Sequence, residues 1–270
     1  MHFTNFLRLL ILSFYITAAT ATSSLNSYTR ASTQRRSQHS LPSPFLAFAA
    51  SPPPPPPATW RTFLDSILPS LDNIIPSNKN NNIEDISSSQ QRIELKRELV
   101  NACLSYYGRN SPSIRSQIES SIDKLTPYNP TLNSATSPLL QRKWVVLWTS
   151  EKEINFFLEN GISSDIIQTL SDGEILENYI PFVKIGGGNG GFGVTGRISV
   201  DDETMTEDEE GKSSLIRTKF KFEKANLNLG RWGTYNFPPV GEGWFDTIYL
   251  DEDLRIDTNS RNDILICRAE

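Results

Sequence analysis

The residues best able to do chemistry are concentrated near the C-terminal end, in the segment 241–256, GEGWFDTIYLDEDLRI. The carboxylate of Asp246, with the phenol of Tyr249 or the guanidinium of Arg255, has the groups of a general base and a stabiliser of negative charge. No nucleophile–base pair can be identified beside them. The pattern therefore favours a protein that is not an enzyme, with carboxylate catalysis as a minor alternative.

Histidine and cysteine usage excludes several other kinds of site. His2 and His39 both lie in the first 57 residues, a segment that we expect to be removed. The remaining chain then cannot use Ser-His-Asp or Cys-His catalysis, a histidine base or His-ligated zinc. Cys103 and Cys267 are too few for a disulfide framework or a four-cysteine metal site. We expect buried thiols, with a redox-switched disulfide as the alternative, and neither a metal nor a cofactor.

Two further segments resemble ligand motifs without meeting their requirements. Gly186, Gly188 and Gly191 have the spacing G-x-G-x-x-G, but a strand pattern follows where a dinucleotide site needs the N-terminus of a helix. A hairpin loop is the better prediction. The run 201–210 holds seven acidic residues but lacks the ligand spacing of an EF-hand, so we expect a solvated loop.

The elements that must position these residues are helices followed by strands. Apolar residues recur on one helical face after residue 89, and Ser111 with Pro112 predicts the start of a second helix. Together these patterns predict a helical hairpin over residues 89–127. From residue 143 to 270 the chain alternates short strands and turns, which predicts a mainly β barrel or sandwich. We expect strands at 143–149, 166–170, 175–183, 192–200, 215–222, 226–235, 243–250, 254–257 and 263–267, with a helix or flap at 150–161.

The spacing of residues in the C-terminal segment predicts a β-hairpin whose loop is Asp251–Asp253. This register sets Tyr249 opposite Arg255 and Asp246 opposite Thr258. We expect the more apolar face to point into the barrel, which makes Asp246 a buried carboxylate in need of a partner. That face carries Trp244, Asp246, Ile248, Leu250, Leu254 and Ile256. A protein partner for Asp246, such as Arg231 or Tyr235, is the favoured interpretation, and the polar head of a ligand is the alternative.

The helical pair, the strand of Trp144 and this closing segment together resemble the plastid lipid-associated proteins, also called fibrillins or the PAP family. The resemblance covers the chain from about residue 93 to residue 268. It implies a lipocalin-like antiparallel β-barrel of about eight strands at 143–270, preceded by the helical hairpin, in a domain spanning 89–270. In lipocalins a Trp near the start of the first strand stacks under an Arg from the last strand, which here implies Trp144 and Arg268. The structural signature is then Tyr249, Asp251, Asp253, Arg255 and Arg268.

The same resemblance implies a role in binding or organising apolar lipids at thylakoid or plastoglobule surfaces. A prenylquinone, a carotenoid or an acyl lipid would suit, and binding requires an internal cavity of roughly 300 Å³ or more. A barrel filled by its own side chains would instead indicate a coat or scaffold that docks plastid enzymes on lipid surfaces. The candidate ligand-binding residues are Trp144, Val146, Trp148, Trp244, Asp246 and Ile248.

The N-terminal region has the composition of targeting sequences, since residues 1–57 contain no Asp or Glu. Residues 1–22 are typical of a signal peptide, and 23–57 of a transit peptide ending in a polyproline spacer, with 58–88 as a linker or attachment segment. Two signals in series predict a secondary plastid reached through the secretory route; the alternative is a secreted protein. Without this prefix, 22 basic residues face 31 acidic ones, a net charge of −9 that disfavours nucleic acid as a partner.

Overall fold

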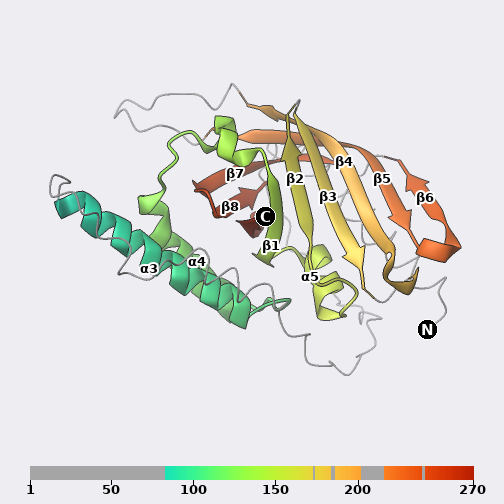
Figure 1. The fold of residues 1–270 in the computed structure, drawn as a ribbon, viewed down its shortest axis with the longest axis horizontal. Coiled ribbons are helices and arrows are strands. Elements are labelled where there is room, and N and C mark those ends of the chain that lie inside the picture. The colour runs from blue at the N-terminus through green and yellow to red at the C-terminus, as the bar shows by residue number, and fades with distance from the viewer. Residues whose placement is uncertain (1–82, 173, 184–185, 202–215, 239–240) are drawn as a thin grey trace, which may run out of the picture.

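The computed structural model describes residues 83–172, 174–183, 186–201, 216–238 and 241–270 (Figure 1). The expected signal peptide, transit peptide and polyproline spacer, and most of the acidic run, lie outside these residues. The helices are α3 (Ile83–Ser105), α4 (Pro112–Leu125) and α5 (Lys152–Glu159). The strands are β1 (Lys143–Thr149), β2 (Ile167–Ser171), β3 (Ile175–Phe182), β4 (Gly190–Val200), β5 (Thr218–Asn228), β6 (Thr234–Phe237), β7 (Glu242–Leu250), β8 (Leu254–Asn259) and β9 (Ile264–Ala269).

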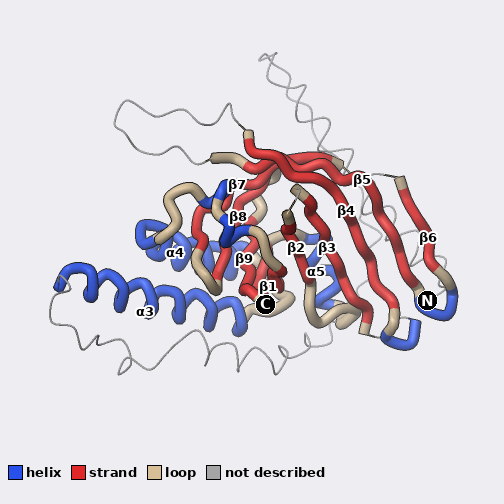
Figure 2. Tube along the Cα trace, turned by 45° about the horizontal axis from the view of Figure 1, so that its top comes forward, coloured by secondary structure: helices blue, strands red, loops and turns tan. Residues whose placement is uncertain are grey.

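The strands of the described residues form one antiparallel sheet that closes on itself. Their order is β4-β3-β2-β1-β9-β8-β7-β5-β6, and β4 also pairs with β5, which completes a ring of eight strands. β7 pairs with the first half of β5 and β6 with its second half, so β6 lies outside the ring. Figure 2 shows this second half of β5 extending beyond the ring together with β6. The predicted mainly β barrel of about eight strands with preceding helices is confirmed.

One pair of predicted strands is wrong. The segments 215–222 and 226–235 are not two successive strands, because β5 runs through residues 223–225 and only the short β6 follows. A β-bulge between Thr195 and Gly196 allows β4 to follow β5 along this length. A Cβ at Gly196 would lie 2.3 Å from the carbonyl oxygen of Lys221, so the two backbones approach too closely there for any other residue.

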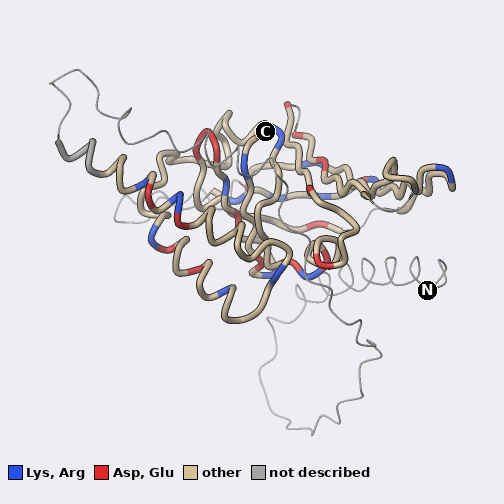
Figure 3. The backbone as a smooth tube through the Cα atoms, turned by 60° about the horizontal axis from the view of Figure 1, so that its bottom comes forward, with Lys and Arg blue, Asp and Glu red and all other residues tan. Residues whose placement is uncertain are grey.

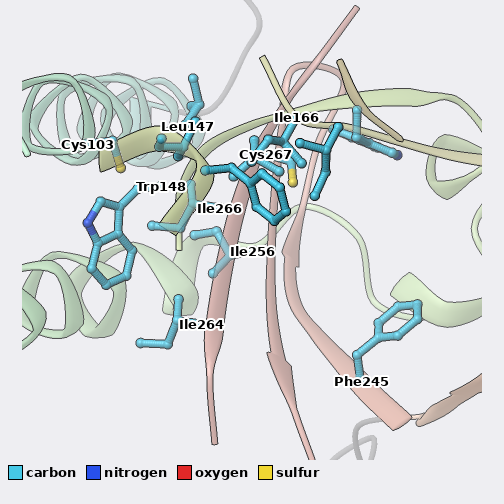
Figure 4. Close-up of a cluster of buried hydrophobic side chains, with 14 of the residues drawn as sticks. Cys103, Leu147, Trp148, Ile166, Phe245, Ile256, Ile264, Ile266 and Cys267 are labelled. Atoms are coloured by element: carbon cyan, nitrogen blue, oxygen red, sulfur yellow. The ribbon is translucent and has the colours of Figure 1, made fainter. Parts of the chain in front are cut away.

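The helical hairpin lies against the outside of the barrel (Figures 1 and 2). The hydroxyl of Ser111 accepts a hydrogen bond from the backbone N–H of Ile114, and Pro112 opens α4. The indole Nε1 of Trp148 donates to the carbonyl oxygen of Arg109, between the two helices, at 3.0 Å. Figure 4 shows Trp148, Ile256 and Ile266 on the same side as Cys103 of α3. This part of the barrel wall is therefore buried on both faces.

The closing hairpin has a different register from the predicted one. Asp246 does pair with Thr258, but a bulge between Thr247 and Tyr249 then shifts the register, so Tyr249 pairs with Ile256 and Leu250 with Arg255. The loop is correspondingly shorter, because the backbone N–H of Asp251 donates to the carbonyl oxygen of Leu254. One extra residue in β7 is enough to change which side chains share a face.

No helix among the described residues combines the length and apolar character needed to cross a membrane.

Candidate ligand-binding cavity

The barrel encloses a partly open cavity of about 220 Å³. The cavity is smaller than the roughly 300 Å³ expected for a ligand-binding barrel, yet the barrel is not filled by its own side chains. Apolar groups from α5 and from strands around the ring form most of its wall: Val146, Ile154, Phe157, Ile166, Ile167, Leu176, Ile180, Phe192, Val194, Phe220, Phe222, Phe245 and Leu265.

The mouth of the cavity lies between α5, the β8–β9 turn and the start of β7. The wall residues Glu242, Ser260 and Arg261 are exposed there. The guanidinium of Arg261 lies 3.4 Å from a carboxylate oxygen of Glu151 and also 3.4 Å from one of Glu153. It therefore ties the start of α5 to the β8–β9 turn. The side chain of Glu151 is 19% exposed, and burial of the rest raises its pKa to about 7 despite the opposing attraction of Arg261.

A chain of polar side chains crosses the interior from β8 to β3. The carboxylate of Asp257 lies 3.0 Å from Nε of Arg255, and both side chains are buried. Nη2 of Arg255 donates to Oε1 of Gln168, whose Nε2 donates to Oδ1 of Asn178 at 2.8 Å. The hydroxyl of Thr247 donates a hydrogen bond to the other carboxylate oxygen of Asp257 at 2.8 Å. Gln168, Asn178 and Asp257 are cavity wall residues, so an otherwise apolar space has a polar floor.

The structure disperses the six predicted ligand residues. Only Val146 is part of the cavity wall. A bulge between Val146 and Trp148 places Trp148 on the outer face, against the helical hairpin, and not on the same face as Trp144 as predicted. Trp144 is fully buried, and its indole Nε1 donates to the carbonyl oxygen of Leu140 at 3.0 Å. The half-buried Ile248 lies at the bulge of β7, away from the cavity.

Trp244 and Asp246 lie on the outer surface, which corrects the predicted inward face. Both oxygens of Asp246 accept hydrogen bonds from Arg217 at 2.9 Å, and the same guanidinium lies 3.4 Å from the centre of the Trp244 ring. The partner of Asp246 is thus Arg217, not Arg231 or Tyr235. The inward-facing neighbours are Phe245 and Thr247, and Asp246 is not brought together with Tyr249 or Arg255.

The physical reason for this reversal is the helical hairpin. Leu254 and Ile256 are fully buried, as predicted, but Ile256 lies on the outer side of the sheet, toward the helices (Figure 4), and Leu254 shares its face of β8. When both faces of a strand are buried, hydrophobicity does not identify the inner one. The inner face of β8 instead carries Arg255 and Asp257.

The signature residues form two separate clusters. Asp251 accepts hydrogen bonds from the Tyr249 hydroxyl and from Nζ of Lys96 in α3, each at 2.8 Å, and Lys96 also reaches Asp253 at 2.7 Å. Although burial alone would raise the pKa of Asp251, Lys96 brings it below its usual value. The second cluster contains Arg255, whose guanidinium carbon lies 5.1 Å from the centre of the Trp144 ring. In the β7–β8 ladder Arg255 pairs with Leu250 and not with Tyr249 as predicted.

The predicted Trp144–Arg268 stack is replaced. Arg268 pairs with Val145 in the β1–β9 ladder, on the face opposite Trp144, while Arg255 and Arg142 lie 5.1 and 5.6 Å from the Trp144 ring. The cation–π contact at this end of the barrel is therefore supplied by β8 and by the residue before β1.

Sequence reasoning missed Gln168, Asn178, Phe192, Phe220 and Phe222 as wall residues. The alternation Leu176, Asn178, Ile180 in β3 would have placed Asn178 on the inner face. Nothing in the sequence pairs Gln168 with Arg255, since this contact joins β2 to β8.

The described residues contain no cluster of His, Cys, Asp and Glu suited to a metal ion. Cys103 and Cys267 are buried free thiols, and burial raises the pKa of each, which keeps both in the unreactive protonated form.

Comparison with known proteins adds a family relationship. Residues 93–268 match the PAP_fibrillin family. The chain is also 29% identical over 164 residues to the probable plastid-lipid-associated protein 11, chloroplastic, of Arabidopsis thaliana, covering 58% of this chain and 69% of that protein. No solved structure matches.

Proposed function

The chain belongs to the PAP/fibrillin family, and from this membership we propose that it is a plastid lipid-associated protein that holds part of one apolar molecule inside its barrel. The observation that carries the proposal is the cavity of about 220 Å³ with a mainly apolar wall and a polar floor. Burial of apolar surface contributes about 25 cal/mol per Å², so such a wall gives affinity without any chemistry. The protein works at thylakoid or plastoglobule surfaces in this proposal.

The chloroplastic relative supports a plastid location. The acid-free N-terminal segment supports the finer proposal of a secondary plastid reached by a bipartite signal.

Lipid extraction of the purified protein, followed by mass spectrometry, tests the binding proposal. We expect one lipid class at up to one molecule per chain. Val194→Trp places a large ring in the cavity wall and should abolish co-purification, whereas Thr195→Trp, the next position of β4, faces away and should not. Absence of lipid from the unmodified protein, together with no binding of added apolar probes, would refute the proposal.

The second candidate function is a scaffold that docks plastid enzymes on lipid surfaces. The specific observation in its favour is the cavity volume, which is below the about 300 Å³ at which small-molecule sites begin. A lipid-free protein that still associates with lipid surfaces would support this candidate.

A further inference from the structure

The polar chain inside the barrel has a fixed direction. Arg255 has only donors, so Oε1 of Gln168 must face it. The amide nitrogen of Gln168 is then turned to Asn178 and donates to its Oδ1. In this arrangement the side-chain oxygen of Asn178 already accepts a hydrogen bond, and its NH₂ group is the remaining polar group of the side chain. Among the described residues none accepts a hydrogen bond from that group, so the floor of the cavity presents a donor.

The charge of the cavity wall is strongly one-sided. It contains the carboxylates of Glu151, Glu153, Glu242, Asp257 and Asp263 against the single guanidinium of Arg261. Asp257 is already engaged by Arg255 and Thr247. Glu151, Glu153 and Asp263 lie within 3.4 Å of the Arg261 guanidinium and already neutralise it. A ligand carboxylate or phosphate would therefore meet a wall of net negative charge and would lose its hydration on entry.

The volume limits how much of a ligand enters. An apolar cavity of about 150 Å³ holds one benzene molecule, whereas complete drug-sized ligands occupy about 300–1,000 Å³. A space of about 220 Å³ accommodates one substituted ring or a short chain end. The rest of a longer molecule must leave through the mouth between α5 and the β8–β9 turn.

From these three observations we infer that the cavity selects an uncharged ligand with a carbonyl-bearing, ring-sized head, which accepts a hydrogen bond from Asn178, and an apolar tail that leaves through the mouth. A quinone with one alkyl or prenyl tail has this chemistry. Free fatty acids lack the neutral head, and hydrocarbon carotenoids lack the acceptor. The inference rests on the proposed function, because it names the ligand class of the same cavity.

Titration calorimetry with matched probes tests the inference on the purified full chain. The probes are decyl-benzoquinone, dodecanoate, dodecylbenzene and dodecylammonium, which differ in head group and share a single tail of similar length. We expect the quinone to bind at least tenfold more tightly than each of the others. Equal or tighter binding of dodecanoate or dodecylammonium would overturn the inference.

Variants of Asn178 test the assigned donor. Asn178→Leu should weaken quinone binding about three- to tenfold, the contribution of one hydrogen bond, and leave dodecylbenzene binding within about twofold. Asn178→Asp keeps the acceptor toward Gln168 but replaces the NH₂ group by an oxygen, and should weaken quinone binding at least as much. Glu177→Leu introduces the same side chain on the exposed face of β3 and should change neither affinity.

The possible outcomes distinguish an error in the inferred ligand class from an error in the proposed binding function. If none of the probes binds the unmodified chain, the binding function fails as well. If dodecylbenzene binds as tightly as the quinone, or if Asn178→Leu weakens both equally, the binding function stands and only the ligand class is wrong.

Discussion

Asp246, the residue that looked most like a functional carboxylate, belongs to an ion pair on the outer surface. Its side chain is 14% exposed and that of Arg217 is 31% exposed. We expect Asp246→Asn to leave lipid and quinone binding unchanged and to lower the unfolding free energy by less than about 1 kcal/mol, because partly exposed pairs contribute little. Urea unfolding and the binding titration check both parts. A loss of ligand binding in this variant would contradict the placement.

Asp257 is the contrasting carboxylate. Its replacement by Asn leaves the buried guanidinium of Arg255 without its counter-ion. Removing one partner of a buried ion pair typically costs about 3–5 kcal/mol, so we expect Asp257→Asn to destabilise the protein far more than Asp246→Asn. A loss below about 1 kcal/mol in urea unfolding would show that the pair is not buried as described.

Asp246 directly follows Trp244 and Phe245, whereas the aromatic residue nearest to Asp257 in the sequence is Tyr249, and neither pattern shows which carboxylate is buried in the barrel. Asp246 was assigned to the interior because its face of β7 and β8 is the more apolar. That reasoning assumes one buried face per strand, and it fails where α3 and α4 cover the outside. The cavity floor was equally unpredictable, because Arg255, Gln168 and Asn178 meet only when the ring closes.

Helix α3 is fastened to the closing hairpin by one buried lysine. Nζ of Lys96 contacts Asp251 and Asp253, and Lys96 is only 6% exposed. Lys96→Met leaves the buried Asp251 without its cation, and we expect a loss of about 3–5 kcal/mol in unfolding free energy. The neighbouring Arg97→Met is the matched control, since Arg97 pairs with the exposed Glu94 and its loss should cost under about 0.5 kcal/mol. Similar losses for both variants would contradict the anchor.

The start of α5 should respond to pH through Glu151. Its folded-state pKa of about 7 lies above its ordinary value of 4.5, so the folded state holds the proton more tightly than the unfolded state. Stability from this group is then greatest below about pH 4.5 and declines as the pH rises to about 7. Glu151→Gln removes this dependence. We expect its Tm to increase relative to the unmodified protein more at pH 8.5 than at pH 5, and an equal change at both pH values would argue against a buried carboxylate.

Among the elements, those with local signals were predicted well. Ser111 and Pro112 mark the start of α4, and the first strand has the predicted bounds Lys143–Thr149. The errors follow from bulges at Gly196 and between Thr247 and Tyr249. The position of a bulge depends on the curvature of the closed ring of strands. The alternation of apolar and polar residues within one strand carries no information about that curvature.

At the scale of the molecule, charge is unevenly distributed between the two ends of the barrel. Figure 3 shows the backbone coloured as basic at the far end of the β5–β6 extension, where Arg231 packs against the exposed Trp232. β4 joins that end to Asp201, the first residue of the acidic run, at its other end. At the mouth, Glu242 at the start of β7 pairs with Lys221 of β5, whereas the backbone N–H of Asp201 donates to the carbonyl oxygen of Arg217, before the start of the same strand. Asp201 therefore lies toward the other end of the barrel.

The location of the whole protein is tested by reporter fusions in a cell with a secondary plastid. We expect residues 1–57 to bring a fluorescent protein into the plastid, and residues 1–22 alone to send it into the secretory route, because the second segment is needed for plastid import. Leu10→Arg with Leu12→Arg places two charges in the apolar run of the expected signal peptide and should leave the full fusion in the cytosol. Secretion of the reporter carried by residues 1–57 would favour the alternative of a secreted protein and would remove thylakoid and plastoglobule surfaces as its place of work.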